Sequence, residues 1–230
     1  MFESITALHD IRVLNLTNMQ NWEQGNLVGL ANELGKIKKV SLNLMSTIRE
    51  KGVKHLLRTA NSLTKLTLSN LSRVKNLDNI FSGEVYPNLS HLTLKGQDLS
   101  KMPLIFRQAY SPFPSLKGLS LKNCRRLSDE LLNEMSACEW FQPETLKFEG
   151  KASFSLRSLT DLVKVKDESL QSLHLNIGGI KKLSGDKNTY TFNPDLSAFV
   201  GVMESLGYSY SVKEGPNSTI KLFFTKSISL

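Results

Sequence analysis

One short pattern of apolar residues returns at nearly constant spacing along most of the chain. It has the form apolar-x-x-apolar-x-apolar, and its seven copies begin at residues 11, 37, 63, 89, 116, 143 and 170. Successive copies are therefore 26, 26, 26, 27, 27 and 27 residues apart, and the sixth is the weakest because Pro143 occupies its first position. A chain with 38 Leu in 230 residues could contain one or two such triplets by chance. Seven copies in constant register indicate an internal structural repeat.

Each repeat combines a segment of strand periodicity with one of helical periodicity. Apolar and polar residues alternate in Leu66–Leu68, which is typical of a short strand with one buried face. Between the strands, apolar residues fall at helical spacing, as in Val53, Leu56 and Leu57. A unit of about 26 residues cannot bury the apolar faces of its strand and its helix alone, so neighbouring units must share a core. The predicted fold class is α/β: a solenoid of about seven repeats, with a parallel strand ladder on its concave face and helices on its convex face.

The repeat pattern divides the chain into three expected parts. Residues 1–10 are expected to be the end of a helix from a preceding repeat, and residues 11–176 form the repeats. Residues 177–230 are expected to be a C-terminal cap with an inserted loop, because the register breaks there. Since the N-terminal end shows no comparable cap, we expect these residues to be part of a longer solenoid.

The expected cap contains signals for one helix and two strands. A helix is predicted near Asp195–Leu206, followed by strands over residues 208–213 and 219–225 that could form a hairpin. One alternative stays open, namely that this part is one more eroded repeat. Ile220 and Leu222 would then fill the later positions of the apolar triplet.

The repeat resembles the leucine-rich repeat, and two units indicate a subtype. One unit reads Leu116-x-x-Leu119-x-Leu121-x-x-Cys124-x-x-Leu127-Ser128-Asp129, and another contains Ile48-Arg49-Glu50-Lys51-Gly52-Val53. Both are similar to the cysteine-containing repeat of F-box and related ubiquitin-ligase receptors. Other copies depart from this pattern at the Cys position, which holds Met19, Met45, Leu71, Gln97 and Gly178. A weaker similarity, in residues 86–94 and 111–116, is to replisome-associated F-box proteins of budding yeasts.

The resemblance implies a function in protein recognition. The chain would be the substrate-recruiting part of an SCF-type (F-box) E3 ubiquitin ligase, and the weaker similarity extends its targets to replication or chromatin proteins. Ligase adaptor subunits would bind through segments outside this chain. The expected compartment is nucleus or cytoplasm, because two Cys cannot make a disulfide scaffold. No apolar run approaches the roughly 18–20 residues of a membrane helix, so we expect no membrane contact.

Sequence patterns for catalysis, cofactor binding or metal binding are missing. The four His are widely separated, and none has metal-ligand spacing with Cys or carboxylates. Gly178-Gly179 lacks the Lys-Ser/Thr pair that would complete a phosphate loop. We interpret Cys124 as a buried structural thiol, because only Arg125 and Arg126 lie near enough in sequence to lower its pKa. We therefore expect no enzymatic activity, no cofactor and no metal.

The side chains between the buried positions of each strand are expected to point to the concave face. This face would carry five lysines and small polar groups, a single acidic residue (Glu149) and no aromatic residue. Such a surface suits an acidic or phosphorylated segment of a protein partner. The predicted partner-binding residues are Asn15, Lys39, Ser41, Asn43, Lys65, Thr67, His91, Thr93, Lys95, Ser120, Lys122, Lys147 and His174.

Other interpretations of the same residues stay open. A solvated strand face has a similar composition, and exposed loop tips could bind instead: Arg125-Arg126, Trp22, or residues 102–106, which are more typical of a core helix. The net charge of +8, from 29 basic and 21 acidic residues, also permits an alternative function. The chain would then be a non-catalytic scaffold on nucleic acid or chromatin without a ubiquitin role. Two short basic clusters, Lys36/Lys38/Lys39 and Arg125-Arg126, would allow a weak, salt-sensitive contact with DNA as a secondary role.

Overall fold

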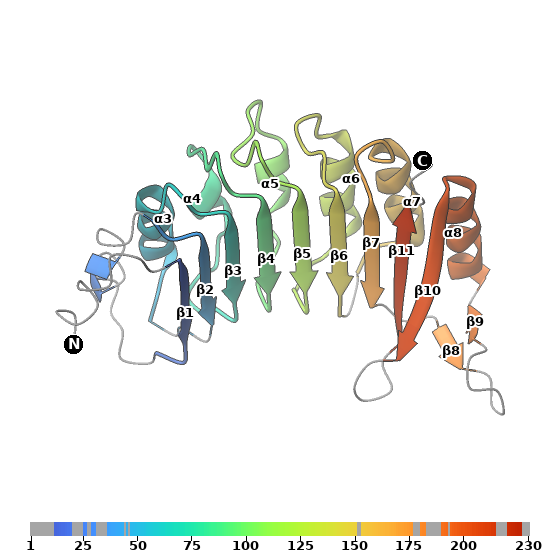
Figure 1. Cartoon of the computed structure of the whole chain (residues 1–230), viewed down its shortest axis with the longest axis horizontal. Coiled ribbons are helices and arrows are strands. Elements are labelled where there is room, and N and C mark those ends of the chain that lie inside the picture. The colour runs from blue at the N-terminus through green and yellow to red at the C-terminus, as the bar shows by residue number, and fades with distance from the viewer. Residues whose placement is uncertain are drawn as a thin grey trace.

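Seven parallel strands, one from each repeat, form the main ladder of the structure (Figure 1). The computed structural model describes residues 12–19, 25–26, 29–30, 36–43, 45, 47–150, 153–176, 180–182, 190–192, 194–214 and 220–226. The strands of the ladder are β1 (Val13–Thr17), β2 (Lys39–Asn43), β3 (Lys65–Ser69), β4 (His91–Lys95), β5 (Gly118–Lys122), β6 (Thr145–Glu149) and β7 (Ser172–Asn176). Each pairs with the next at equivalent repeat positions, so that Leu14, Val40 and Leu66 stand in one row. The predicted fold class, a leucine-rich-repeat solenoid, is confirmed by this ladder.

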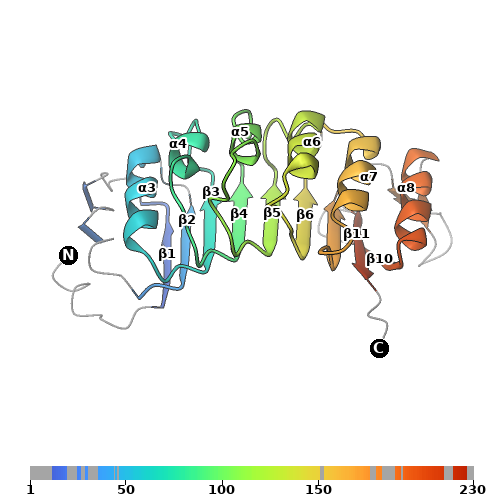
Figure 2. The same ribbon diagram turned by 90° about the horizontal axis from the view of Figure 1, so that it is seen from above.

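The helices of the repeats cover one side of the ladder (Figure 2). They are α3 (Glu50–Thr59), α4 (Asp78–Phe81), α5 (Pro103–Phe106), α6 (Asp129–Ala137) and α7 (Leu156–Val165). Helix α3 buries Val53, Leu56 and Leu57, the three residues whose spacing predicted a helix. Helices α4 and α5 are single turns, and α5 begins at Pro103, where a residue without an N–H leaves no donor unpaired.

The core lies between the strands and the helices and runs through the repeats without interruption. The second and fourth residues of each strand from β2 to β7 point towards the helices, and their side chains are at most 2% exposed. Burying each such leucine contributes about 2 kcal/mol of transfer free energy. The leucine content of the chain therefore follows from the repeat, because every unit must supply its own share of one continuous core.

The residue immediately after a strand turns the chain through a left-handed conformation in most repeats. Asparagine and glycine adopt a positive φ at lower cost than other residues, and they occupy this position. The φ angles are 56° at Asn18, 50° at Asn70, 64° at Gly96, 48° at Asn123 and 111° at Gly150. The apolar pattern of the repeat does not contain this position, because its residues are selected for backbone conformation rather than for burial.

The C-terminal part continues the sheet but reverses the strand direction. Strand β11 (Ile220–Lys226) pairs antiparallel with β7, and β10 (Tyr208–Glu214) pairs antiparallel with β11 at the edge. Helix α8 (Pro194–Ser205) packs against β10 and α7, while β8 (Ile180–Lys182) and β9 (Tyr190–Phe192) form a separate antiparallel pair. An eighth repeat would add a parallel strand, so the eroded-repeat alternative is wrong.

The structure describes only some of the residues in the three expected parts of the chain. Residues 1–10 lie outside the described residues, so the expected helix end there stays a prediction. The boundaries 11–176 and 177–230 also stay predictions. In the described part of the chain, no helix is long and apolar enough to cross a membrane.

Candidate strand-face binding site

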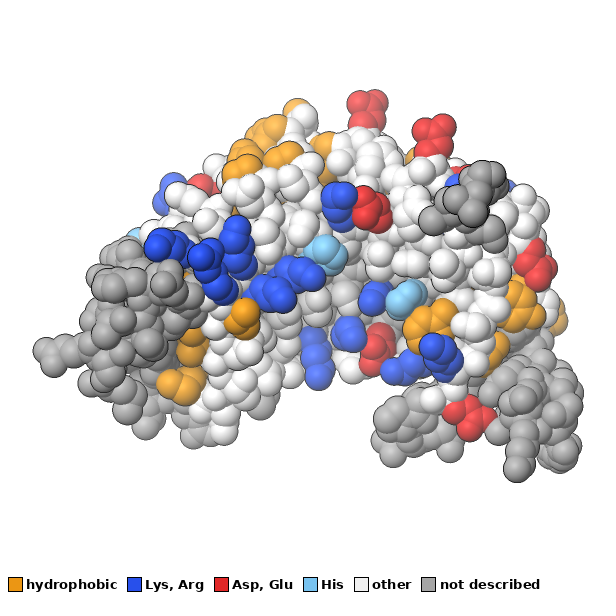
Figure 3. All heavy atoms as spheres, in the orientation of Figure 1, with side chains coloured by type: hydrophobic (Ala, Val, Ile, Leu, Met, Phe, Trp, Pro, Cys, Tyr) orange, Lys and Arg blue, Asp and Glu red, His pale blue; other side chains and the backbone are white. Residues whose placement is uncertain are grey.

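The first, third and fifth residues of β1 to β7 point away from the helices, onto a surface that we call the strand face. In β4, for example, His91 and Lys95 are exposed while the two leucines between them are buried. Figure 3 shows Lys and Arg side chains gathered across this face with few Asp or Glu among them. The thirteen residues proposed from the sequence all occupy these positions: Asn15, Lys39, Ser41, Asn43, Lys65, Thr67, His91, Thr93, Lys95, Ser120, Lys122, Lys147 and His174. Their role in binding stays a prediction.

Lysines on the strand face stand directly beside one another. Lys39 is the register partner of Lys65, and Lys95 is the partner of Lys122. Like charges on neighbouring strands, about 4.8 Å apart in the pairing direction, repel each other and destabilise a sheet. Glu149 offsets part of this charge, since its carboxylate lies 3.3 Å from the Lys122 ammonium. The positive charge of the face therefore weakens the pairing of the strands that carry it.

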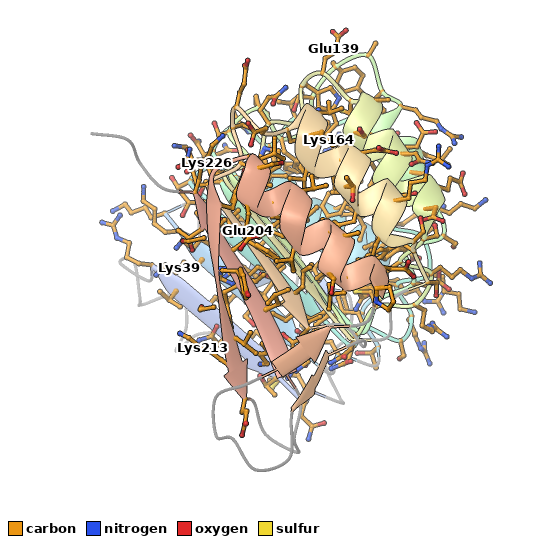
Figure 4. All side chains as sticks on the ribbon, turned by 90° about the vertical axis from the view of Figure 1, so that its right-hand side faces the viewer. Lys39, Glu139, Lys164, Glu204, Lys213 and Lys226 are labelled. Carbon is orange, nitrogen blue, oxygen red and sulfur yellow. The ribbon has the colours of Figure 1, made fainter. Side chains whose placement is uncertain are left out.

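The C-terminal hairpin extends the strand face beyond the repeats. Phe223 is the register partner of His174, and Lys221 is the partner of Lys213, so all of them share one side of the sheet. The seven repeat strands contribute no aromatic residue to this face, and the hairpin adds one. The Phe223 ring makes an edge-to-face contact with His174, with centroids 4.8 Å apart, and the Lys213 ammonium lies 5.2 Å from its centroid. Figure 4 shows Lys39 and Lys213, from opposite ends of the sheet, projecting to the same side, with Lys164 among the helices.

A hollow of about 310 Å³ lies over β4, β5 and β6, and we call it the Ser120 hollow. Gly118 provides part of its space because it has no side chain. A Cβ atom at Gly118 would lie 2.7 Å from Cδ2 of His91, so the glycine allows the imidazole ring to lie over β5. The remaining lining residues include Thr93, Ser120, Lys122, Thr145 and Lys147.

A second hollow of about 140 Å³ lies over β6, β7 and β11, and we call it the Phe223 hollow. It shares Lys122 and Lys147 with the Ser120 hollow, and the hairpin contributes Lys221 and Phe223. The sequence interpretation missed this contribution, because it considered only the seven repeats. The alternation of Leu222, Phe223 and Phe224 is the signal that could have found it, since one of three consecutive apolar residues in a strand must face away from the core.

The electrostatic field of the lysines acts on the two histidines of the face. The pKa of His174 is lowered to about 4, first by burial and then by Lys147, Lys122 and Lys213. The pKa of His91 is also lowered, mainly by burial and by Lys65. Both imidazoles are therefore neutral at pH 7, and the positive charge of the face comes from the lysines.

The low pKa of His174 predicts a loss of stability in mild acid. The unfolded chain has an imidazole pKa of 6.5, so between pH 6.5 and about 4 it binds a proton that the folded chain does not. The free energy of unfolding should fall as the pH falls through this window and should level off below it. Urea unfolding of the wild type and of His174→Gln at several pH values measures this, with His55→Gln in α3 as the control. A pH dependence unchanged in His174→Gln would contradict the prediction.

The three loop segments considered as alternative binding sites do not form one exposed surface among the described residues. Met102, Pro103, Ile105 and Phe106 are buried, so most of the segment 102–106 belongs to the core and only Leu104 is exposed. Arg125 and Arg126 are exposed, whereas Trp22 lies outside the described residues.

The structure confirms that Cys124 is a buried thiol. Its Sγ lies 3.3 Å from the carbonyl oxygen of Leu94 and 3.4 Å from that of Lys122, so these two acceptors share its one S–H donor. Burial raises its pKa, which disfavours the nucleophilic thiolate. Among the described residues, no group of three or more His, Cys, Asp or Glu is placed to hold a metal ion.

Comparisons with known proteins do not show to which family the chain belongs. No family model matches the chain. No curated protein matches it either. Among solved structures, the chain is similar to the tropomodulin C-terminal domain of Caenorhabditis elegans, with 14% sequence identity, a TM-score of 0.39, and coverage of 73% of this chain and 92% of that one. A likeness at this level carries no argument about function, so the fold assignment depends on the strand ladder itself.

Proposed function

We propose that this chain is a non-catalytic protein-recognition module whose strand face binds an acidic or phosphorylated segment of a partner protein. The observation that carries the proposal is the pairing of like-charged lysines on neighbouring strands, Lys39 with Lys65 and Lys95 with Lys122. Repulsion within each pair is relieved when an anionic group binds between them, because the bound charge attracts both ammonium groups. A negatively charged partner therefore gains affinity by relieving the repulsion between lysines that is present in the unbound protein.

The form of the surface supports a macromolecular partner over a small molecule. The two hollows share the lining residues Lys122 and Lys147, so they lie side by side over β4, β5, β6, β7 and β11. An extended peptide can cross several strands of such a surface, whereas a small metabolite is usually enclosed by its pocket. The aromatic ring of Phe223 at one end offers the kind of rigid anchor that protein interfaces favour.

The finer proposal follows from the resemblance of the repeats. The 26–27-residue period and the Cys124 unit are similar to those of F-box receptors, so the chain would recruit the substrate of an SCF-type ubiquitin ligase in the nucleus or cytoplasm. In that case the solenoid would hold the target, and other subunits would carry the ubiquitin-transfer chemistry. The resemblance to replisome-associated F-box proteins would make replication or chromatin proteins the targets.

Charge reversal at four lysines tests the proposal. Lys39, Lys65, Lys95 and Lys122 are replaced together by Glu, and binding to arrays of acidic, phosphorylated and neutral peptides is measured. The affinity for acidic and phosphorylated peptides should fall by about tenfold or more, because attraction becomes repulsion. The thermal unfolding temperature should fall only slightly, because each side chain is at least partly exposed and the one ion pair lost, Lys122 with Glu149, lies near the surface.

A matched control changes the same amount of charge on the helix side. Lys51, Lys101, Arg157 and Lys164 are exposed on or beside the helices, and their replacement by Glu should leave peptide binding near the wild-type level. If binding survives the strand-face change, the proposed surface is wrong. Binding of duplex DNA with a steep salt dependence, and of no peptide, would instead favour the nucleic-acid scaffold.

A further inference from the structure

The floor of the Ser120 hollow contains a buried hydroxyl group without a hydrogen-bond partner. Ser120 is 8% exposed, and its Oγ atom makes no hydrogen bond within the structure. Buried hydroxyls are almost always paired, because an unpaired one loses its hydrogen bonds to water without replacement. The position of this hydroxyl in the hollow therefore favours a ligand that accepts a hydrogen bond there.

Two lysines flank this hydroxyl at well-defined positions. Lys147 is the register partner of Ser120 on β6, and Lys122 lies two residues further along β5 on the same face. Glu149 forms an ion pair with Lys122, whereas the described residues contain no acidic partner for Lys147 within ion-pair distance. One serine and two lysines thus line the same hollow.

His91 completes the opposite wall of the hollow. Its Nδ1 lies 2.9 Å from Oγ of Ser90, and that hydroxyl donates its own hydrogen to the carbonyl oxygen of Thr64. In that arrangement Ser90 Oγ accepts from Nδ1–H, and Nε2 of the neutral ring carries no proton. The Nε2 edge of the ring lies over Gly118, towards the hollow.

We propose that the Ser120 hollow binds the phosphoryl group of a phosphorylated serine or threonine in the partner segment. This inference rests on the proposed function, because it assigns one chemical group of the partner to one part of the strand face. A phosphoryl group has three acceptor oxygens and carries a charge of about −1.5 to −2 at neutral pH. Ser120 Oγ, Lys147 and Lys122 supply one donor group for each oxygen. A carboxylate has two oxygens and a single charge, so it matches these donors less completely.

Binding of a phosphoryl group should change the protonation of His91. Its pKa is lowered by burial, by Lys65 on β3, by Lys147 on β6 and by Lys117 before β5, while Glu144 before β6 acts in the opposite direction. A bound dianion opposes the lysines and raises the pKa of the ring. The protonated ring then presents an Nε2–H group towards the hollow, which can donate to a phosphoryl oxygen.

The experiment compares three peptide pools on the full chain. One pool has a central phosphoserine or phosphothreonine in an otherwise degenerate sequence, the second has Asp at that position, and the third is unphosphorylated. Fluorescence anisotropy should show that the wild type prefers the phosphorylated pool over the Asp pool by about tenfold or more, as expected for added charge-assisted hydrogen bonds. In NMR titrations, the His91 pKa should rise when the phosphorylated pool is present.

Two variants locate the binding position. Ser120→Ala and Lys147→Met should each lower the affinity for the phosphorylated pool by a larger factor than the affinity for the unphosphorylated pool. The controls are Ser197→Ala and Lys164→Met, which remove the same groups from exposed positions on helices α8 and α7. Ser120→Ala removes an unpaired hydroxyl, so its thermal stability should equal or exceed that of the wild type. Circular dichroism verifies that each variant is folded.

The outcomes separate this inference from the proposed function. If the phosphorylated and Asp pools bind equally well, or if both Ser120→Ala and Lys147→Met keep the phosphate preference, the phosphoryl site is wrong while acidic-segment recognition stands. If no pool binds, both proposals are overturned. A phosphate preference that is lost in both variants and kept in both controls supports the assignment.

Discussion

Replacing Phe224 by Ala is expected to lower the free energy of unfolding by about 3–5 kcal/mol, the usual range for removing a buried aromatic ring. Phe224 is 0% exposed and joins the C-terminal hairpin to the rest of the core. Its ring contacts Phe199 of α8 edge-to-face at 5.6 Å and Tyr210 of β10 at 6.1 Å. In register it stands beside Leu173 of β7, so the cavity would open where the hairpin meets the last repeat. Urea unfolding measures the total loss.

Hydrogen exchange can show where the Phe224→Ala change acts. Each unit of a solenoid contacts only its neighbours, so the loss should be concentrated at the C-terminal end. Amides of β10 and β11 should exchange faster in the variant, whereas those of β3 and β4 should be protected as in the wild type. A uniform change along the chain would contradict this local effect.

The neighbouring residue Phe223 provides the matched control. Phe223→Ala removes the same atoms from the same strand, but on the strand face, where the ring is only partly buried. Its contacts with His174 and Lys213 are expected to contribute about 1–2 kcal/mol together. If the two variants lose equal stability, the assignment of the two rings to opposite faces is wrong.

Gly150→Ala is expected to cost about 3 kcal/mol or more, the sum of backbone strain and steric overlap. Gly150 follows β6 with a φ angle of 111°, a conformation that residues with a Cβ atom rarely adopt. A Cβ atom there would lie 2.9 Å from Cα and 3.1 Å from the backbone nitrogen of Asn123. These are backbone atoms of the preceding repeat turn, so they cannot move aside without disturbing the stacking. Thermal and urea unfolding measure the effect.

Gly83→Ala separates the two causes. Gly83 also has a positive φ, of 75°, but a Cβ atom there would meet nothing within 4 Å. Its replacement should cost only about 1–2 kcal/mol, the strain of a left-handed residue. Similar losses in Gly83→Ala and Gly150→Ala would show that the contact between repeat turns is unimportant.

Much of the fold can be predicted from the apolar period. The rows formed by Leu14, Val40 and Leu66 follow from a spacing of 26 residues, because equivalent positions must align when similar units stack. The helix that buries Val53, Leu56 and Leu57 is predicted by the same argument. The turn residues Asn70 and Gly96 escape this approach, since a left-handed conformation leaves no trace in a pattern of hydrophobicity.

The candidate site is predictable only in part. The lysines at positions 39, 65, 95 and 122 can be assigned to one face, because side chains alternate along every strand of a repeat. That Ser120 is buried and unpaired could not be predicted, because this depends on how the side chains of β4 and β6 fill the space around it.

The ladder, its core and the lysine-bearing side follow from the apolar period, because similar units that each bury leucine stack with equivalent positions aligned. The end of the ladder depends instead on contacts in the folded sheet. Leu222 and Phe224 would fill core positions in a strand of either direction, since alternation along a strand is the same when the strand is reversed. Pairing with the free edge of β7 selects the antiparallel direction of β11, and this places Phe223 beside His174. The aromatic end of the proposed binding surface is therefore a property of the assembled sheet.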